Sequence, residues 1–103
     1  MEFQLEQRDG RWCASGDMTI YSAAVMKQRV LASMESAGDD VLLDLSQVTE
    51  LDTCGLQILL LAERQAASEG RRLKLIEPSA ATREVLTLCG LDRLRGGASP
   101  RGA

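Results

Sequence analysis

The stretch VLLDLSQVTELDTCGLQILLLA, residues 41–62, places a polar corner between two apolar segments. Its first part, residues 41–45, is a nearly continuous apolar run, which is the pattern of a strand covered on both faces. Its last part gathers apolar residues on one broad helical face, and we expect that helix to begin near Asp52 or Thr53 and to end near Glu69. A buried strand followed by an amphipathic helix is typical of a layered α/β fold.

The segments before this stretch predict a hairpin and a first helix. Residues 2–8 alternate apolar and polar side chains at their start, and Asp9-Gly10 then supplies a turn before a second strand. A helix is expected between Ser22, a suitable N-cap, and Gly38, a suitable stop. Its apolar positions recur at helical spacing: Ala23, Met26, Val30 and Met34.

The segments after the stretch predict one more strand and one more helix. Alternating side chains in residues 71–76 favour a strand that stops before Pro78. Ser79 then caps a helix that carries Cys89, and Gly90 closes that helix. The predicted order of elements is β-β-α-β-α-β-α.

The 103 residues are enough for one domain and too few for two. We expect a single α/β domain over residues 1–94, with a mixed sheet of four to five strands, and a flexible C-terminal tail over residues 95–103. Only one Trp, one Tyr and one Phe are present, so the core must be aliphatic.

The charge distribution indicates which kind of partner the chain binds, and the cysteine spacing indicates the state of its thiols. Residues 1–52 hold 10 acidic and 4 basic residues, a net charge of −6, whereas residues 53–103 hold 5 acidic and 8 basic residues, a net charge of +3. This balance favours a protein partner and no nucleic acid, which needs a clustered basic surface. Three widely spaced cysteines predict reduced thiols that act as small apolar side chains: Cys13, Cys54 and Cys89.

The start of the chain and its apolar runs predict a cytoplasmic protein. No run of about 18 apolar residues occurs, so we expect no direct membrane insertion. The opening MEFQLEQRDG also lacks the charged and apolar regions of a secretory signal.

The residue types that most catalytic and metal sites require are missing. Histidine is absent, which excludes Ser-His-Asp and Cys-His catalysis and the commonest metal ligand. The cysteines lack C-x-x-C spacing, and no glycine-rich phosphate loop occurs. The carboxylate pairs Asp39 with Asp40 and Asp44 with Asp52 are typical of solvated turns and strand ends. We therefore expect no catalytic residues, no metal and no cofactor.

The corner LDTCGL, residues 51–56, is the remaining candidate site. Asp52 or Thr53 can cap the helix by accepting hydrogen bonds from its first N–H groups. Gly55 in the first turn costs roughly 1 kcal/mol relative to alanine, which indicates close approach of another backbone, either within the fold or from a partner. Cys54 is expected to pack inside, and Leu61 falls on the wet side of the helix, where it is either an isolated apolar residue or part of a docking patch.

The run LLDLSQVTELDTCGLQILLLA resembles the motif of the STAS domain, a module of sulfate transporters and bacterial anti-sigma-factor antagonists. That motif, D-[LF]-S-x-V-x-x-[LIM]-D-[ST]-x-G-[LV], links a strand to a helix. Both SGDMTIYSA and RRLKLIEPSAATREVLTLCGLDRL extend the resemblance over most of the chain. The residues that match the motif include Asp44, Ser46, Val48, Asp52, Thr53, Gly55 and Leu56.

The resemblance implies a switch at Thr53. In anti-sigma-factor antagonists the Ser or Thr after the second Asp is phosphorylated by a serine kinase that is also the anti-sigma factor. Carried over, the unphosphorylated chain binds that partner and the phosphorylated chain releases it. A phosphate adds about −1.5 to −2 charge beside Asp52, which a helix N-terminus tolerates and an interface does not. The partner-binding residues implied are Asp52, Thr53, Cys54, Gly55, Gln57 and Leu61.

Other functions remain open. STAS proteins with DT-x-GL also resemble subunits of lipid-transport ATPase complexes of the ABC type and single-domain proteins near chemotaxis operons, in which the threonine is a contact residue without a known kinase. A small-ligand or nucleotide sensor is a rival of another class, because α/β domains often hold ligands at strand ends. An enzyme ranks last, for want of a nucleophile and base.

Overall fold

The computed structural model describes residues 2–36 and 40–91, which form a four-stranded sheet and three α-helices. The elements follow the predicted order, with one short 3-10 helix added before the first α-helix. Their bounds are β1 (Gln4–Arg8), β2 (Arg11–Met18), η1 (Ile20–Ser22), α1 (Ala23–Ser36), β3 (Val41–Leu51), α2 (Thr53–Ser68), β4 (Leu73–Ile76) and α3 (Ala80–Leu88).

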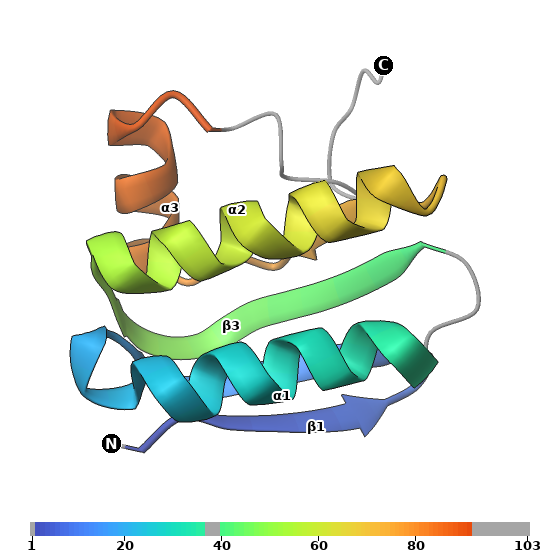
Figure 1. The fold of residues 1–103 in the computed structure, drawn as a ribbon. Coiled ribbons are helices and arrows are strands. Elements are labelled where there is room, and N and C mark those ends of the chain that lie inside the picture. Colours follow the sequence, from blue (N-terminus) through green and yellow to red (C-terminus); the bar gives the residue numbers. More distant parts are fainter. Residues whose placement is uncertain (1, 37–39, 92–103) are drawn as a thin grey trace.

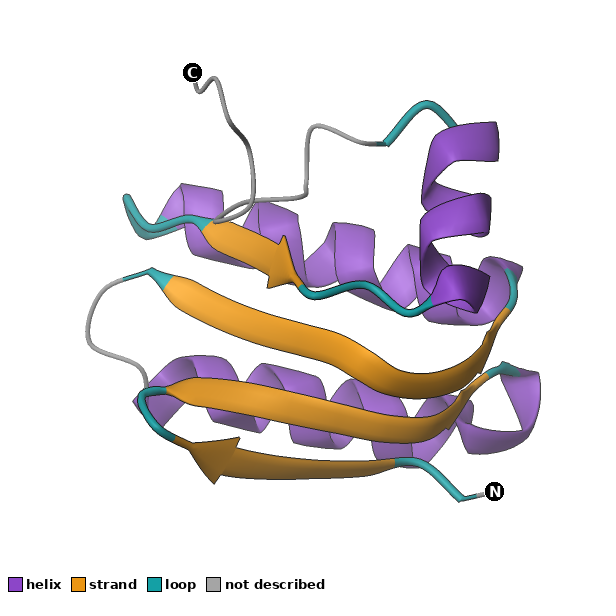
Figure 2. Ribbon diagram, turned by 180° about the vertical axis from the view of Figure 1, so that it is seen from behind, coloured by secondary structure: helices purple, strands orange, loops and turns teal. Residues whose placement is uncertain are grey.

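The sheet is mixed, and its strands lie in the order β1-β2-β3-β4. The β1–β2 pair is antiparallel, whereas β2–β3 and β3–β4 are parallel and are joined through α1 and α2. Helices α1 and α2 lie side by side over one face of the sheet, and α3 packs against β3 near one end (Figures 1 and 2). The predicted α/β layering is confirmed.

The hairpin at the start has the predicted turn. Asp9 and Gly10 both have positive φ, 50° and 79°. Two positive φ values in a two-residue loop match the right-handed twist of the flanking strands. Arg8 and Arg11 face each other across the turn.

The core lies between the sheet and the α1–α2 layer and is aliphatic, as predicted. It joins methionines to branched aliphatic residues that are almost fully buried: Met18, Met26, Val30, Met34, Leu43, Leu45, Leu59 and Leu75. Its large methionine share suits a small domain because these flexible side chains fill irregular gaps between the layers.

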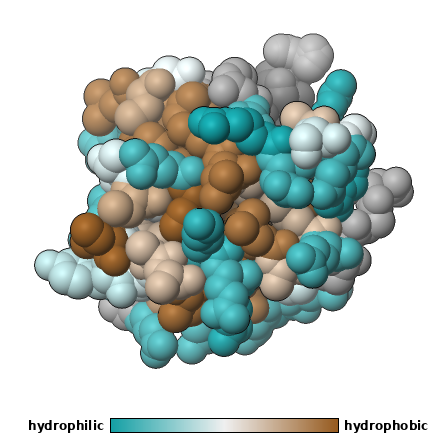
Figure 3. Space-filling view, in the orientation of Figure 1, coloured by the Kyte–Doolittle hydropathy of each residue, from teal (hydrophilic) through white to brown (hydrophobic). Residues whose placement is uncertain are grey.

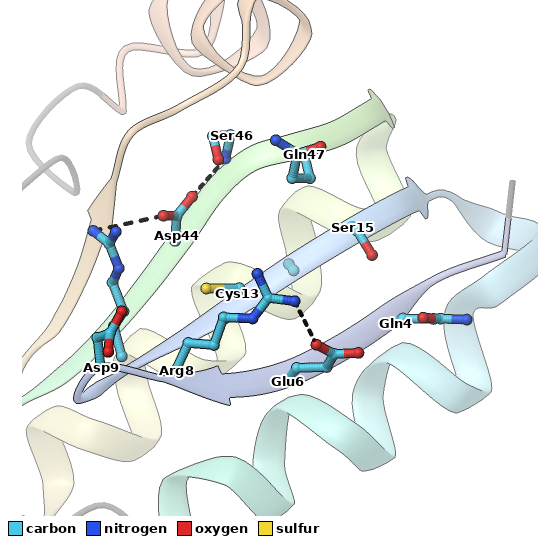
Figure 4. A pocket seen from close by; sticks show the side chains of 11 residues that line it. Gln4, Glu6, Arg8, Asp9, Cys13, Ser15, Asp44, Ser46 and Gln47 are labelled. Carbon is cyan, nitrogen blue, oxygen red and sulfur yellow. Dashed lines mark hydrogen bonds and ion pairs between the residues drawn. The ribbon is translucent and has the colours of Figure 1, made fainter.

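Strand β3 is longer than its apolar run. Residues 41–45 are buried or half-buried, but the strand continues to Leu51, and buried residues recur at Val48 and Leu51. The register to β2 shifts twice along this part, between Cys13 and Ser15 and between Gly16 and Asp17 on the β2 side. Each shift adds a residue to β3, so the inward positions are three apart rather than two. The face away from α1 and α2 carries polar side chains at Asp44, Ser46 and Gln47 (Figure 4). The predicted cover on both faces therefore fits residues 41–45, whereas the extension of the strand exposes Ser46 and Gln47.

Helix ends agree with most of the predictions. Glycines with positive φ follow α2 and α3, at Gly70 (φ 72°) and Gly90 (φ 68°). The Ser79 side chain accepts a hydrogen bond from Thr82 N at the start of α3. The start of α1 differs, because Ser22 belongs to η1, where its N–H donates to Thr19 O.

Two predictions fall on residues outside the described ranges. These are the helix stop at Gly38 and the domain end at residue 94 with its tail. Within the described ranges, no helix has both the length and the apolar character that a membrane crossing requires.

Candidate functional site

Asp52 holds the corner between β3 and α2 together. Its carboxylate accepts a hydrogen bond from Gly55 N at 3.1 Å, which caps α2, and another from Ile20 N at 3.0 Å. Its own N–H donates to Met18 O at 3.2 Å. The sequence left the cap open between Asp52 and Thr53, and the geometry assigns it to Asp52. One side chain therefore ties the start of α2 to the segment that follows β2.

Gly55 is required by the same close approach. A Cβ at this position would lie 2.1 Å from Met18 O and 2.7 Å from Leu51 Cδ1, distances that real Cβ atoms do not adopt. The second backbone that the sequence predicted is therefore the end of β2, inside the fold. Gly55 is buried, so it positions the corner from within.

Thr53 is the first residue of α2 and is exposed. Gln57, one turn further, is also exposed, and Leu61 is half-buried two turns further. Positions spaced by four residues share one side of a helix, so these three line one outer stripe of α2.

Cys54 is half-buried rather than fully packed inside. The same holds for Cys13, and Cys89 is exposed, so the cysteines are free thiols but not all core residues.

Sequence reasoning missed two exposed apolar residues beside the corner. Ile20 is 61% exposed and Tyr21 is 94% exposed, both in η1. Apolar side chains reach the end of the molecule where η1, the start of α2 and α3 lie (Figures 1 and 3). An apolar pair just before the predicted first helix was the available signal, but only the hydrogen bond from Ile20 N to Asp52 places it at the site.

A groove of about 320 Å³ opens next to Asp52. The segment after β2, the end of β3 and α3 supply its walls, and its lining includes Thr19, Tyr21, Glu50, Asp52 and Glu84. The groove therefore combines three carboxylates with an aromatic ring. Asp17 lies close by, where Thr49 Oγ1 donates to it at 3.3 Å across β2 and β3.

The motif residues Asp44 and Ser46 lie away from this corner, on the open face of the sheet (Figure 4). Asp44 is buried, accepts a hydrogen bond from Ser46 N at 2.8 Å and pairs with Arg11 at 3.6 Å. Its side chain thus stabilises β3 where the strand bulges. A polar groove of about 530 Å³ runs over this face. In it, the hydrogen bond and charge of Glu6 raise the pKa of Arg8 above its ordinary value.

The described residues contain no group of three or more His, Cys, Asp or Glu side chains that could hold a metal ion.

The family model for the Mlab STAS domain matches residues 1–96. The chain belongs to the STAS domain family. The mixed sheet and the strand-to-helix corner described above are those of a STAS domain. No curated protein matches the sequence closely enough to show common descent.

Several solved structures are similar to this STAS domain. An anti-sigma factor antagonist from Mycobacterium paratuberculosis is 26% identical over 91% of this chain and 81% of its own, with a TM-score of 0.73. RsbS of Moorella thermoacetica, in a substituted form, is 26% identical over 95% of this chain and 85% of its own, with a TM-score of 0.63. The anti-sigma factor antagonist SpoIIAA in its unphosphorylated form is 19% identical over 97% of this chain and 90% of its own, with a TM-score of 0.71. The last of these shows the fold alone.

Proposed function

We propose that this STAS domain is a regulatory binding protein, an anti-sigma-factor antagonist that acts without catalysis of its own. Its partner is a serine-kinase-like anti-sigma factor in the cytoplasm, and phosphorylation of Thr53 controls the contact. The observation that carries the proposal is the exposed Thr53 at the first position of α2, on a corner that Asp52 and Gly55 hold rigid. The similarity to the anti-sigma factor antagonist from Mycobacterium paratuberculosis supports it.

The local geometry explains how a phosphate on Thr53 could act without unfolding the domain. The Thr53 side chain is exposed, and Asp52 rather than Thr53 caps the helix, so modification of Thr53 leaves the cap intact. A phosphate carrying about −1.5 to −2 charge is compatible with the positive end of a helix. A partner packed over the stripe of Thr53, Gln57 and Leu61 would have to desolvate that charge, which is costly. Modification would therefore weaken binding and preserve the fold.

The test is the intact mass of the protein purified from its native cells, compared with the variant Thr53→Ala. A phosphate mass on the wild type that disappears in Thr53→Ala is the expected result. Thr49→Ala is the matched control, since Thr49 is an exposed threonine four positions away on β3. Loss of the phosphate in Thr49→Ala alone, or its absence from the wild type under every growth and stress condition, would reject Thr53 as the acceptor.

A constitutive subunit of a transporter ATPase is the second candidate. The matching family model is that of the Mlab STAS domain rather than one named for antagonists. The exposed stripe on α2 suits a permanent contact equally well, because Thr53 needs no modification to pack against a partner. Affinity purification separates the two candidates: the co-purifying protein is a kinase-like anti-sigma factor for the switch and an ATPase for the subunit.

A further inference from the structure

The groove beside Asp52 contains a buried hydroxyl that has no partner. Thr19 is 7% exposed and lines the groove, and its Oγ1 has no hydrogen bond within the part of the chain that the structure describes. A buried polar group without a partner costs roughly 1–3 kcal/mol. A donor from another molecule that reached this hydroxyl would remove that cost.

The groove is also strongly acidic. Glu50 comes from β3, Asp52 from the corner and Glu84 from α3, and all three carboxylates line the same space. Among residues 2–36 and 40–91, no ion pair engages Glu50 or Glu84, and both side chains are exposed. No basic residue is part of the lining. An entering cation therefore meets no competing positive charge at the groove wall.

Tyr21 adds an aromatic face to one side of the groove. Its side chain is 94% exposed, so the ring is accessible to another molecule. A guanidinium group suits this combination because it presents five N–H donors in a plane and stacks on aromatic rings. A lysine ammonium group carries the same charge but lacks the planar arrangement of N–H donors. It can therefore pair with the carboxylates but does not match the carboxylates and the aromatic ring together.

We propose that this groove binds an exposed arginine side chain of the protein partner. The inference rests on the proposed function, because it names the chemistry of the partner at the same corner. The guanidinium lies between Glu50 and Glu84, stacks against Tyr21 and donates to Thr19 Oγ1. Thr53 does not line the groove, so the arginine anchor and the phosphate-sensitive contact use different residues.

The test is a titration of the full-length, isotope-labelled protein with N-acetylarginine amide, followed by the backbone amide resonances. Saturable shifts at Tyr21, Glu50 and Glu84 are expected. Nα-acetylcitrulline amide has the same shape without charge and should cause no shifts. Nα-acetyllysine amide, which keeps its side-chain ammonium group, should bind more weakly. Absence of saturable shifts with the arginine probe, or equal shifts with arginine and lysine spread over all acidic surfaces, overturns the proposal.

Substitutions of the groove residues test where the arginine probe binds. Glu50→Gln combined with Glu84→Gln should weaken the arginine probe about fivefold, the loss expected for two partly solvated ion pairs. Glu35→Gln, an exposed glutamate on α1, is the control and should change nothing. Thr19→Val removes the hydroxyl at nearly constant shape, so it should leave thermal stability equal or higher and still weaken the probe. A Thr19→Val variant that binds arginine as tightly as the wild type contradicts the role of the hydroxyl.

The two proposals can fail separately. Arginine binding should persist in Thr53→Ala, because the groove is intact there. Arginine binding without any phosphate on Thr53 would support the groove and reject the switch. Phosphate on Thr53 without arginine binding would reject the groove and leave the switch standing.

Discussion

At the level of single residues, Asp52, Gly55 and Thr53 have different roles at the corner between β3 and α2. Asp52 joins two segments by accepting hydrogen bonds from Gly55 N and Ile20 N, and Gly55 leaves room for the carbonyl of Met18. Thr53 takes part in neither contact, so its side chain is available to solvent. A rigid frame with one accessible hydroxyl is therefore built from neighbouring positions in the chain.

Gly55→Ala tests the close approach. The new Cβ would lie 2.1 Å from Met18 O, and neither backbone can move without breaking the Asp52 contacts. We expect a loss of at least about 3 kcal/mol in the free energy of unfolding, at the upper end of overpacking effects. Urea denaturation measures it.

Gly70→Ala is the matched control for this substitution. Gly70 has φ 72°, and nothing lies within 4 Å of the place that a Cβ would take, so only backbone strain of about 1–2 kcal/mol is expected. If Gly55→Ala costs no more than Gly70→Ala, the backbones at the corner are not in tight contact.

At the level of elements, β3 and α2 carry the site, and their ends determine its geometry. The bulges in β3 turn its last residues so that Val48 and Leu51 stay buried while Glu50 reaches the groove. The far end of α2 is held by Arg71, whose Nη1 donates to Met34 O at 2.8 Å and whose Nη2 pairs with Glu69. Arg71 therefore links the ends of α1 and α2.

Arg71→Ala should lower the free energy of unfolding by about 1.5–3 kcal/mol, since it removes a charge-assisted hydrogen bond from a side chain that is only 14% exposed. Arg72→Ala is the control, because the hydrogen bond of Arg72 to Asp40 uses the backbone N–H and survives the change. Equal losses in the two variants would contradict the link through Arg71.

Arg71→Ala should also change the pKa of Glu69, and with it the stability of the protein at acid pH. Hydrogen bonds from Arg71 and then Gln65 lower the pKa of Glu69 below its ordinary value. A lowered folded-state pKa stabilises the protein above the unfolded-state pKa, and this contribution fades as the pH falls through the folded value. In Arg71→Ala the pKa of Glu69 should rise towards its ordinary value, which a carboxyl NMR titration measures.

At the level of the whole molecule, the candidate site lies at one end, where segments distant in sequence meet. The start of α2 meets η1 and lies at the end of the sheet near α3 (Figure 1). The core extends beneath the α1–α2 layer, so a change at the exposed stripe of α2 need not reach it. Binding and folding should therefore be separable by mutation.

Thr53→Glu tests this separation. A carboxylate at the first position of a helix is favourable, so the free energy of unfolding should change by no more than about 0.5 kcal/mol. Binding to the partner should be lost, as measured by affinity purification from cell extract. Ala67→Glu adds the same charge at the exposed far end of α2 and should still bind. Retained binding by Thr53→Glu would place Thr53 outside the interface.

The order of elements, the hairpin turn, most helix ends and the corner motif could all be predicted from the chain alone. They follow from local causes: side-chain periodicity, caps and the freedom of glycine, as at Asp9-Gly10, Ser79 and Gly70. The choice of Asp52 as the cap, the contact of Met18 O with the Gly55 position and the two bulges along β3 emerged only in three dimensions.

The groove, too, exists only in the folded chain, which brings Thr19, Tyr21, Glu50 and Glu84 together. Such contacts join residues far apart in the sequence. The hydrogen bond from Ile20 N to Asp52, for example, spans 32 positions. Periodicity and capping act over a few residues, so no local pattern encodes which distant backbones and side chains will meet.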